Sequence, residues 1–150
     1  MELILWRHAD AAEGSPDNSR PLTDKGRRQA ERMALFLTDR LPPNTRTLVS
    51  PALRAQQTAA ALSTKFITAP NLGTHATPET AIATAGWPLA GGAALLVGHQ
   101  PWMGELACQL MTGQPDIWSI KKGAVWWFSR REREGDYQTI LRLVISPDQL

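Results

Sequence analysis

Three short segments made almost entirely of apolar residues constrain the fold of this 150-residue chain more than any other feature of its sequence. They are residues 2–6, residues 47–49 and the segment AALLVG at residues 93–98. Segments this short and this continuously apolar are typical of strands that are covered on both faces, as in parallel sheets. We therefore expect helices on both sides of a sheet built from these three strands.

A helical pattern follows each of the three segments. Thr23 is a favourable N-cap, and apolar residues recur after it at helical spacing until the proline pair at residues 42–43, which is expected to end the helix. Ser50 and Pro51 are expected to cap and open a second helix that runs through ALRAQQTAAALST. Pro101 is expected to open a third helix directly after the last apolar strand.

The rest of the chain completes the predicted architecture. Residues 67–92 are rich in glycine and proline, which indicates loops and one short helix near residues 79–85. The segments AVWWFS and YQTILRLVIS flank a charged turn and predict a β-hairpin. The chain is therefore predicted to be one domain, residues 1–150, of the α/β class: a three-layer sandwich with a mostly parallel sheet flanked by helices, followed by a C-terminal β-hairpin.

Composition limits the classes of partner and location. The formal net charge of +2 is too small to indicate a nucleic acid or an anionic membrane as the partner, although it does not report on local clustering. A single cysteine, Cys108, rules out an intramolecular disulfide. The N-terminal apolar run is too short for a signal peptide or a spanning helix, so we expect a cytoplasmic protein. Nothing in the sequence requires an oligomer, and we expect a monomer.

Polar side chains that bind anions follow each of the three predicted strands. Arg7 and His8 end the first strand, Arg54 lies in the first turn after the second, and His99 follows the third. Ligands of open α/β sheets bind outside the carboxyl ends of the strands. Two arginines and two histidines at this edge, beside helix N-termini, are suited to a compact and multiply charged anion such as a phosphoryl group.

The sequence gives no pattern for a metal or a nucleotide cofactor. It has no cluster of carboxylates, no Cys–His set and no pair of histidines at metal-binding spacing. It also has no glycine-rich nucleotide fingerprint, since the Gly91–Gly92 pair precedes a strand instead of following one. We therefore expect a site that uses no metal and no cofactor.

Four segments in order, LILWRHAD, RPLTDKGRRQA, LVSPALRAQQTA and LLVGHQP, resemble the histidine phosphatase superfamily, and the short chain is most similar to its compact branch, the SixA-type phosphohistidine phosphatases. The resemblance implies that His8 is the nucleophile and is transiently phosphorylated. It implies that Arg7 and Arg54 bind the phosphoryl oxygens and that His99 stabilises the charge of the same group in the transition state. It also implies a phosphohistidine-bearing protein as the substrate. The family usually has glycine after the Arg-His pair, where this chain has Ala9.

Two further residues are candidates for roles at the site. Larger relatives use a carboxylic acid to protonate the leaving group, and Glu79 is the best candidate by its order in the chain. Trp102, which follows the GHQP turn, is a candidate for the mouth of the pocket. Two other functions stay open: a small-molecule phosphomonoesterase of the same superfamily, and a weakly active module that binds phosphoproteins.

Overall fold

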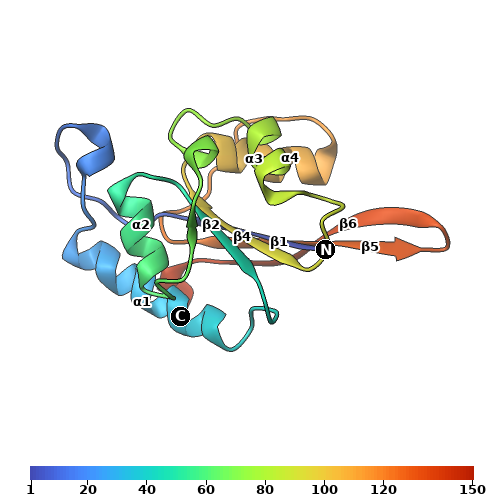
Figure 1. The fold of residues 1–150 in the computed structure, drawn as a ribbon, viewed down its shortest axis with the longest axis horizontal. Coiled ribbons are helices and arrows are strands. Elements are labelled where there is room, and N and C mark those ends of the chain that lie inside the picture. The colour runs from blue at the N-terminus through green and yellow to red at the C-terminus, as the bar shows by residue number, and fades with distance from the viewer.

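The computed structural model describes residues 1–150 and has three layers, with one six-stranded sheet between two layers of helices (Figure 1). The strand order is β3-β2-β4-β1-β5-β6. The first four of these strands are parallel, whereas β5 runs antiparallel to β1 and forms a hairpin with β6. This arrangement confirms the predicted fold class and the predicted C-terminal hairpin. The strands are β1 (Glu2–Arg7), β2 (Arg46–Val49), β3 (Ile67–Thr68), β4 (Ala93–Gly98), β5 (Val125–Arg133) and β6 (Asp136–Ile145).

Four helices cover the sheet, two on each face (Figure 1). Helices α1 (Asp24–Thr38) and α2 (Leu53–Ala60) pack on one face, and α3 (Pro78–Ala85) and α4 (Trp102–Thr112) pack on the other. Three short 3₁₀ helices complete the chain: η1 (Asp17–Ser19), η2 (Pro70–Leu72) and η3 (Pro147–Gln149). No helix combines the length and the apolar character needed to cross a membrane.

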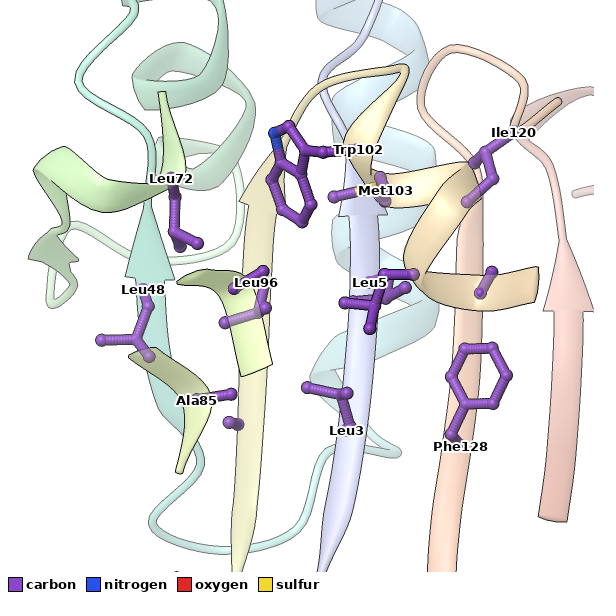
Figure 2. Close-up of a cluster of buried hydrophobic side chains, with 14 of the residues drawn as sticks. Leu3, Leu5, Leu48, Leu72, Ala85, Leu96, Trp102, Met103, Ile120 and Phe128 are labelled. Atoms are coloured by element: carbon purple, nitrogen blue, oxygen red, sulfur yellow. The ribbon is translucent and has the colours of Figure 1, made fainter. Parts of the chain in front are cut away.

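Alternation along β1 explains why every position from Leu3 to Trp6, the buried part of this strand, is apolar. Leu3 and Leu5 belong to the cluster beneath α3 and α4, whereas Ile4 and Trp6 belong to the cluster beneath α1 and α2. Successive side chains of a strand point to opposite faces, so a strand covered on both faces needs apolar residues throughout. Figure 2 shows the first cluster, in which Leu3 and Leu5 lie between Leu96 of β4 and Phe128 of β5.

The helix boundaries follow the predicted signals at some ends and depart from them at others. Thr23 is the N-cap of α1, and its Oγ1 accepts a hydrogen bond from the Gly26 N–H at 3.0 Å. This helix ends at Thr38, before the two prolines that were expected to stop it. The prediction that Ser50 caps the second helix is wrong, because α2 begins at Leu53 and its N-cap is Ala52. The hydroxyl of Ser50 is therefore available for another contact.

Candidate active site

Parallel pairing brings the ends of three strands together. Strand β4 lies between β2 and β1, so the carboxyl ends of all three lie at one edge of the sheet. The N–H of His8 donates to the carbonyl of Gly98 at 3.0 Å, which fixes the residue after β1 beside the residue after β4. As a result, the ring centroids of His8 and His99 are 5.1 Å apart. Two histidines separated widely in the sequence thus share one small site.

His8 is held as a neutral imidazole with one nitrogen free. Its Nδ1 lies 2.8 Å from the carbonyl oxygen of Ala9, and because a carbonyl only accepts, Nδ1 carries the hydrogen. Nε2 therefore keeps its lone pair. The pKa of His8 is lowered to about 4, chiefly by burial and in smaller part by the positive charges of Arg54 and Arg7. Burial is the largest of these causes.

Ser50 determines the form of His99. Its Oγ lies 2.7 Å from His99 Nε2 and accepts a hydrogen bond from the Ala52 N–H at 3.2 Å. The imidazole nitrogen is the only acceptor that is hydrogen-bonded to this hydroxyl, so the hydroxyl donates to Nε2 and the ring hydrogen lies on Nδ1. Burial, followed by the influence of His8, lowers the pKa of His99 to about 3. His99 is therefore a neutral hydrogen-bond donor through Nδ1.

Both arginines are anchored at one end of the guanidinium group. Arg7 donates from Nη1 to the carbonyl of Ile120 at 2.6 Å. Arg54, which is only 4% exposed, donates from Nη1 to the carbonyl of Asp17 at 2.8 Å and from Nη2 to its carboxylate at 3.0 Å. The Nε atoms of both arginines are buried and have no hydrogen-bond partner within the protein. The same is true of His99 Nδ1.

These unpartnered donors define what the site can bind. Buried N–H groups are nearly always hydrogen-bonded in native proteins, so three of them around His8 call for acceptor oxygens. Two of the three belong to cationic groups, which form the strongest hydrogen bonds to an oxyanion. A tetrahedral oxyanion such as phosphate supplies several acceptor oxygens in a small volume. The donor set therefore fits a phosphoryl group held next to the free lone pair of His8 Nε2.

Asp17 is a member of the site that was missing from the sequence-based prediction. It lies in η1, and its carboxylate binds both Arg54 and Arg20, each at 3.0 Å. Hydrogen bonds from these two arginines lower the pKa of Asp17, so the carboxylate is ionised at neutral pH. No local pattern marked Asp17, because the loop at residues 10–21 has no periodicity and α2 lies far along the chain.

The prediction for Trp102 is wrong, and none of the four side chains lines the hollow in which Glu79 lies. Trp102 is fully buried within the first hydrophobic cluster (Figure 2). It packs so closely on Gly98 that a Cβ atom there would lie 2.3 Å from the indole ring. It belongs to the core and does not line a pocket mouth. Glu79 is exposed in the first turn of α3, in a hollow that it shares with Glu105 and Asp116. The carboxylate in contact with Arg54 is that of Asp17.

Ala9 fits its position without strain. Its φ angle is not positive, so the backbone does not require glycine there. The methyl group is fully buried and clusters with Leu22 and Ala30. The N–H of Ala9 donates to Thr58 Oγ1 at 3.0 Å, which ties the segment after His8 to α2. The alanine is therefore compatible with the geometry of the site.

Comparisons with known proteins show what this chain is similar to. The sequence profile of the histidine phosphatase superfamily (branch 1) matches residues 3–73. An uncharacterised protein of Picosynechococcus is 37% identical over 129 residues, which cover 76% of this chain and 75% of the relative. The phosphohistidine phosphatase SixA of Escherichia coli is 42% identical over 59 residues, which cover 39% of this chain and 37% of that protein.

The fold itself is shared with a solved SixA structure. The protein histidine phosphatase SixA complexed with tungstate superimposes with a TM-score of 0.80 at 27% identity, covering 99% of both chains. The profile match contains Arg7, His8 and Arg54, and the structural match extends to the region of His99. The sequence matches and the shared fold, together with the presence of these four side chains, show that the protein belongs to the histidine phosphatase superfamily.

Proposed function

We propose that this protein is a phosphatase that works through a phosphohistidine intermediate on His8 and removes phosphate from phosphohistidine carried by another protein. One observation carries the proposal: neutral His8 has a free Nε2, and three buried donors have no partner within the protein, one on the neighbouring His99 ring and two on the arginines whose charges act on His8. A nucleophile with a lone pair and a preorganised set of oxyanion donors are the main requirements of phosphoryl transfer.

The first step transfers the phosphoryl group to the enzyme. The lone pair of His8 Nε2 attacks phosphorus, and the bond between phosphorus and the substrate imidazole breaks. The departing imidazole keeps the electron pair and takes up a proton from solvent. The Nε–H groups of Arg7 and Arg54 and the Nδ1–H of His99 bind the phosphoryl oxygens, on which negative charge is concentrated. The Ala9 carbonyl stabilises the positive charge of phosphorylated His8, because it accepts from Nδ1–H.

The second step regenerates the enzyme. A water molecule attacks the phosphorus atom, and the bond to Nε2 breaks with its electron pair returning to His8. The water gives up one proton, and inorganic phosphate leaves. His8 is again the neutral imidazole in which it began, and Nδ1 has kept its hydrogen throughout. The donors of Arg7, Arg54 and His99 serve both steps without changing their protonation.

The carboxylates around the site favour an imidazole leaving group. Asp17 is the carboxylate in contact with Arg54, and its pKa is lowered, so it is a poor proton donor at neutral pH. An alkoxide leaving group needs such a donor, whereas an imidazole leaves more readily without one. The proposed substrate therefore matches the acid–base groups that contact these side chains.

The surface next to the site also favours a substrate carried on a protein. A hollow of about 360 Å³ lies between η1 and η2 and is lined by Asn18, Pro51 and residues of the 70–80 segment. Most of its lining residues are exposed, so the 70–80 segment borders the hollow on one side and does not cover it. Small metabolites are usually enclosed by their sites, whereas a side chain on a protein surface has to be approached from outside.

The test is formation of a phosphoenzyme. Wild-type protein is incubated with a histidine-phosphorylated protein and, separately, with simple phosphomonoesters. We expect turnover of the phosphohistidine and an acid-labile, alkali-stable phosphoenzyme. His8→Ala should abolish both, whereas Arg131→Ala, which changes an exposed residue of β5 outside the site and outside the hollow between η1 and η2, should abolish neither. Normal turnover by His8→Ala would overturn the mechanism, and activity on phosphomonoesters alone would overturn the proposed substrate.

A further inference from the structure

A second charged surface lies beside the site and is not used by the proposed chemistry. Helix α1 and the segment before β5 enclose a hollow of about 400 Å³, here called the basic hollow. Its lining residues are Lys25, Arg28, Gln29, Arg32, Lys121, Lys122, Pro147 and Asp148.

The residues that line the basic hollow carry a larger positive net charge than the whole chain does. Its lining carries five cations and one carboxylate, a net charge of +4, whereas the whole chain carries +2. The remainder of the molecule therefore has a net charge of −2. Lys25, Arg28 and Arg32 are exposed and form no ion pair with any carboxylate of the chain. Like charges grouped in this way repel one another, and such grouping favours an acidic partner.

The basic hollow is directly connected to the segment that carries the nucleophile. Lys122 binds the Asp10 carboxylate at 2.8 Å, and Gln29 accepts a hydrogen bond from the Asp10 N–H at 2.9 Å. Asp10 is the second residue after His8. The N–H of Gly123, next to Lys122, donates to the carbonyl of His8 at 3.1 Å. A partner whose phosphorylated side chain reached His8 would therefore lie close to these cations.

We propose that the basic hollow is a docking surface for an acidic face of the phosphorylated protein substrate, next to its phosphohistidine. The inference rests on the proposed function and adds the surface charge of the substrate to it. A protein with a local acidic face fits better than a nucleic acid or a membrane, because the rest of this molecule has a net negative charge. A long polyanion or an anionic bilayer would extend beyond the hollow and meet that charge.

The test reverses charge in the hollow and at a matched distant position. Arg28→Glu/Arg32→Glu changes two exposed arginines on one face of α1, since they are four residues apart. Arg131→Glu/Arg133→Glu makes the same change in charge and residue type at the exposed end of β5. For both variants and wild type, kcat/KM is measured on a histidine-phosphorylated carrier protein with an acidic surface and on phosphoimidazole. Each measurement is repeated across a salt series, because exposed charges act within a Debye length of about 10 Å at 0.1 M salt.

The α1 variant should lose about tenfold or more in kcat/KM on the carrier at low salt, and most of its salt dependence, because charges at the rim of an interface mainly control association. Its kcat/KM on phosphoimidazole should be unchanged, and the hairpin variant should match wild type on both substrates. A carrier whose acidic residues are replaced by lysine should be a poor substrate for wild type and a better one for the α1 variant.

Three results would overturn the inference. The first is an unchanged kcat/KM of the α1 variant on the acidic carrier. The second is an equal loss on phosphoimidazole, which would place the two arginines in the catalytic site itself. The third is wild-type binding to single-stranded DNA or to vesicles with phosphatidylserine that disappears in the α1 variant while carrier hydrolysis is retained. Failure of wild type to hydrolyse any phosphohistidine carrier is a separate result: it would remove the proposed function, and the docking proposal with it.

Discussion

The hydroxyl of Ser50 and the Nε2 of His99 are 2.7 Å apart, and this contact determines which nitrogen of His99 carries a hydrogen. Because the hydroxyl donates to Nε2, the hydrogen of the neutral ring lies on Nδ1, which is buried and has no partner within the protein. Ser50 is fully buried, and in the proposed mechanism it acts on the phosphoryl group through His99. It is a positioning residue, and the function of a helix cap expected from the sequence does not describe it.

Ser50→Ala should lower kcat by about tenfold, less than the loss of a direct oxyanion donor, since Ser50 acts through His99. Ser50→Thr, which keeps the hydroxyl, should restore most of the activity. The decisive measurement is ¹⁵N NMR of the His99 ring, which should report Nδ1–H in wild type and a mixture of tautomers in Ser50→Ala. An unchanged ring spectrum together with reduced activity would show that Ser50 has only a structural effect.

Asp17→Asn should bind inorganic phosphate more tightly than wild type. The carboxylate bonded to Arg54 opposes the approach of an anion, and the amide keeps an acceptor oxygen for the guanidinium while losing the charge. Because Asp17 is exposed, the effect should correspond to about 0.5–1 kcal/mol, or roughly a two- to fivefold decrease in the inhibition constant of phosphate. Asp39→Asn, an exposed carboxylate after α1, is the matched control. Weaker inhibition of Asp17→Asn by phosphate would contradict this account.

The protein should lose stability as the pH falls from about 6.5, the ordinary pKa of histidine, toward 4. Burial lowers the pKa of His8 to about 4 and that of His99 to about 3. In this interval the unfolded chain binds protons that the native state does not, so the free energy of unfolding decreases. For His8 alone the loss is about 3 kcal/mol once the pH reaches 4.

Urea unfolding at pH 7, 5.5 and 4.5 measures this dependence. The double variant His8→Asn/His99→Asn should show a much weaker decrease over the same interval, whereas His75→Asn should behave as wild type because His75 is exposed. A wild-type free energy of unfolding that stays constant from pH 7 to pH 4.5 would contradict the prediction.

Gly26→Ala should destabilise the protein although it improves the helix propensity of α1. Propensity alone predicts a gain of about 1 kcal/mol for alanine in place of glycine inside a helix. However, a Cβ atom at Gly26 would lie 1.9 Å from the carbonyl oxygen of Asp10, so the backbone after His8 would have to move. We expect a net loss of about 1–3 kcal/mol and reduced activity, measured by urea unfolding and by phosphatase assay. Arg27→Ala, at the exposed neighbouring position, is the control, and a higher melting temperature for Gly26→Ala with full activity would refute the argument.

The sequence by itself determined five of the six strands, most of the helices and the chemical character of the proposed site, but it missed β3 in a segment predicted as loops. Continuous apolar runs showed that β1 and β4 are covered on both faces, and helical spacing showed which faces of the helices are buried. These are local properties, because a strand or a helix repeats over a few residues. Arg7, His8, Arg54 and His99 were proposed as site residues for the same reason, since each stands at or shortly after a recognisable strand end.

Only the tertiary structure decided how these side chains are held. Ser50 meets His99 across 49 residues and Asp17 meets Arg54 across 37, and neither pair has a local signature. Trp102 was a candidate for the mouth of the pocket because it follows a turn, yet its packing against Gly98 buries it completely. The physical reason is common to all three. Periodicity reports which face of an element is buried, whereas contacts between elements depend on strand order and on where each loop returns to the sheet.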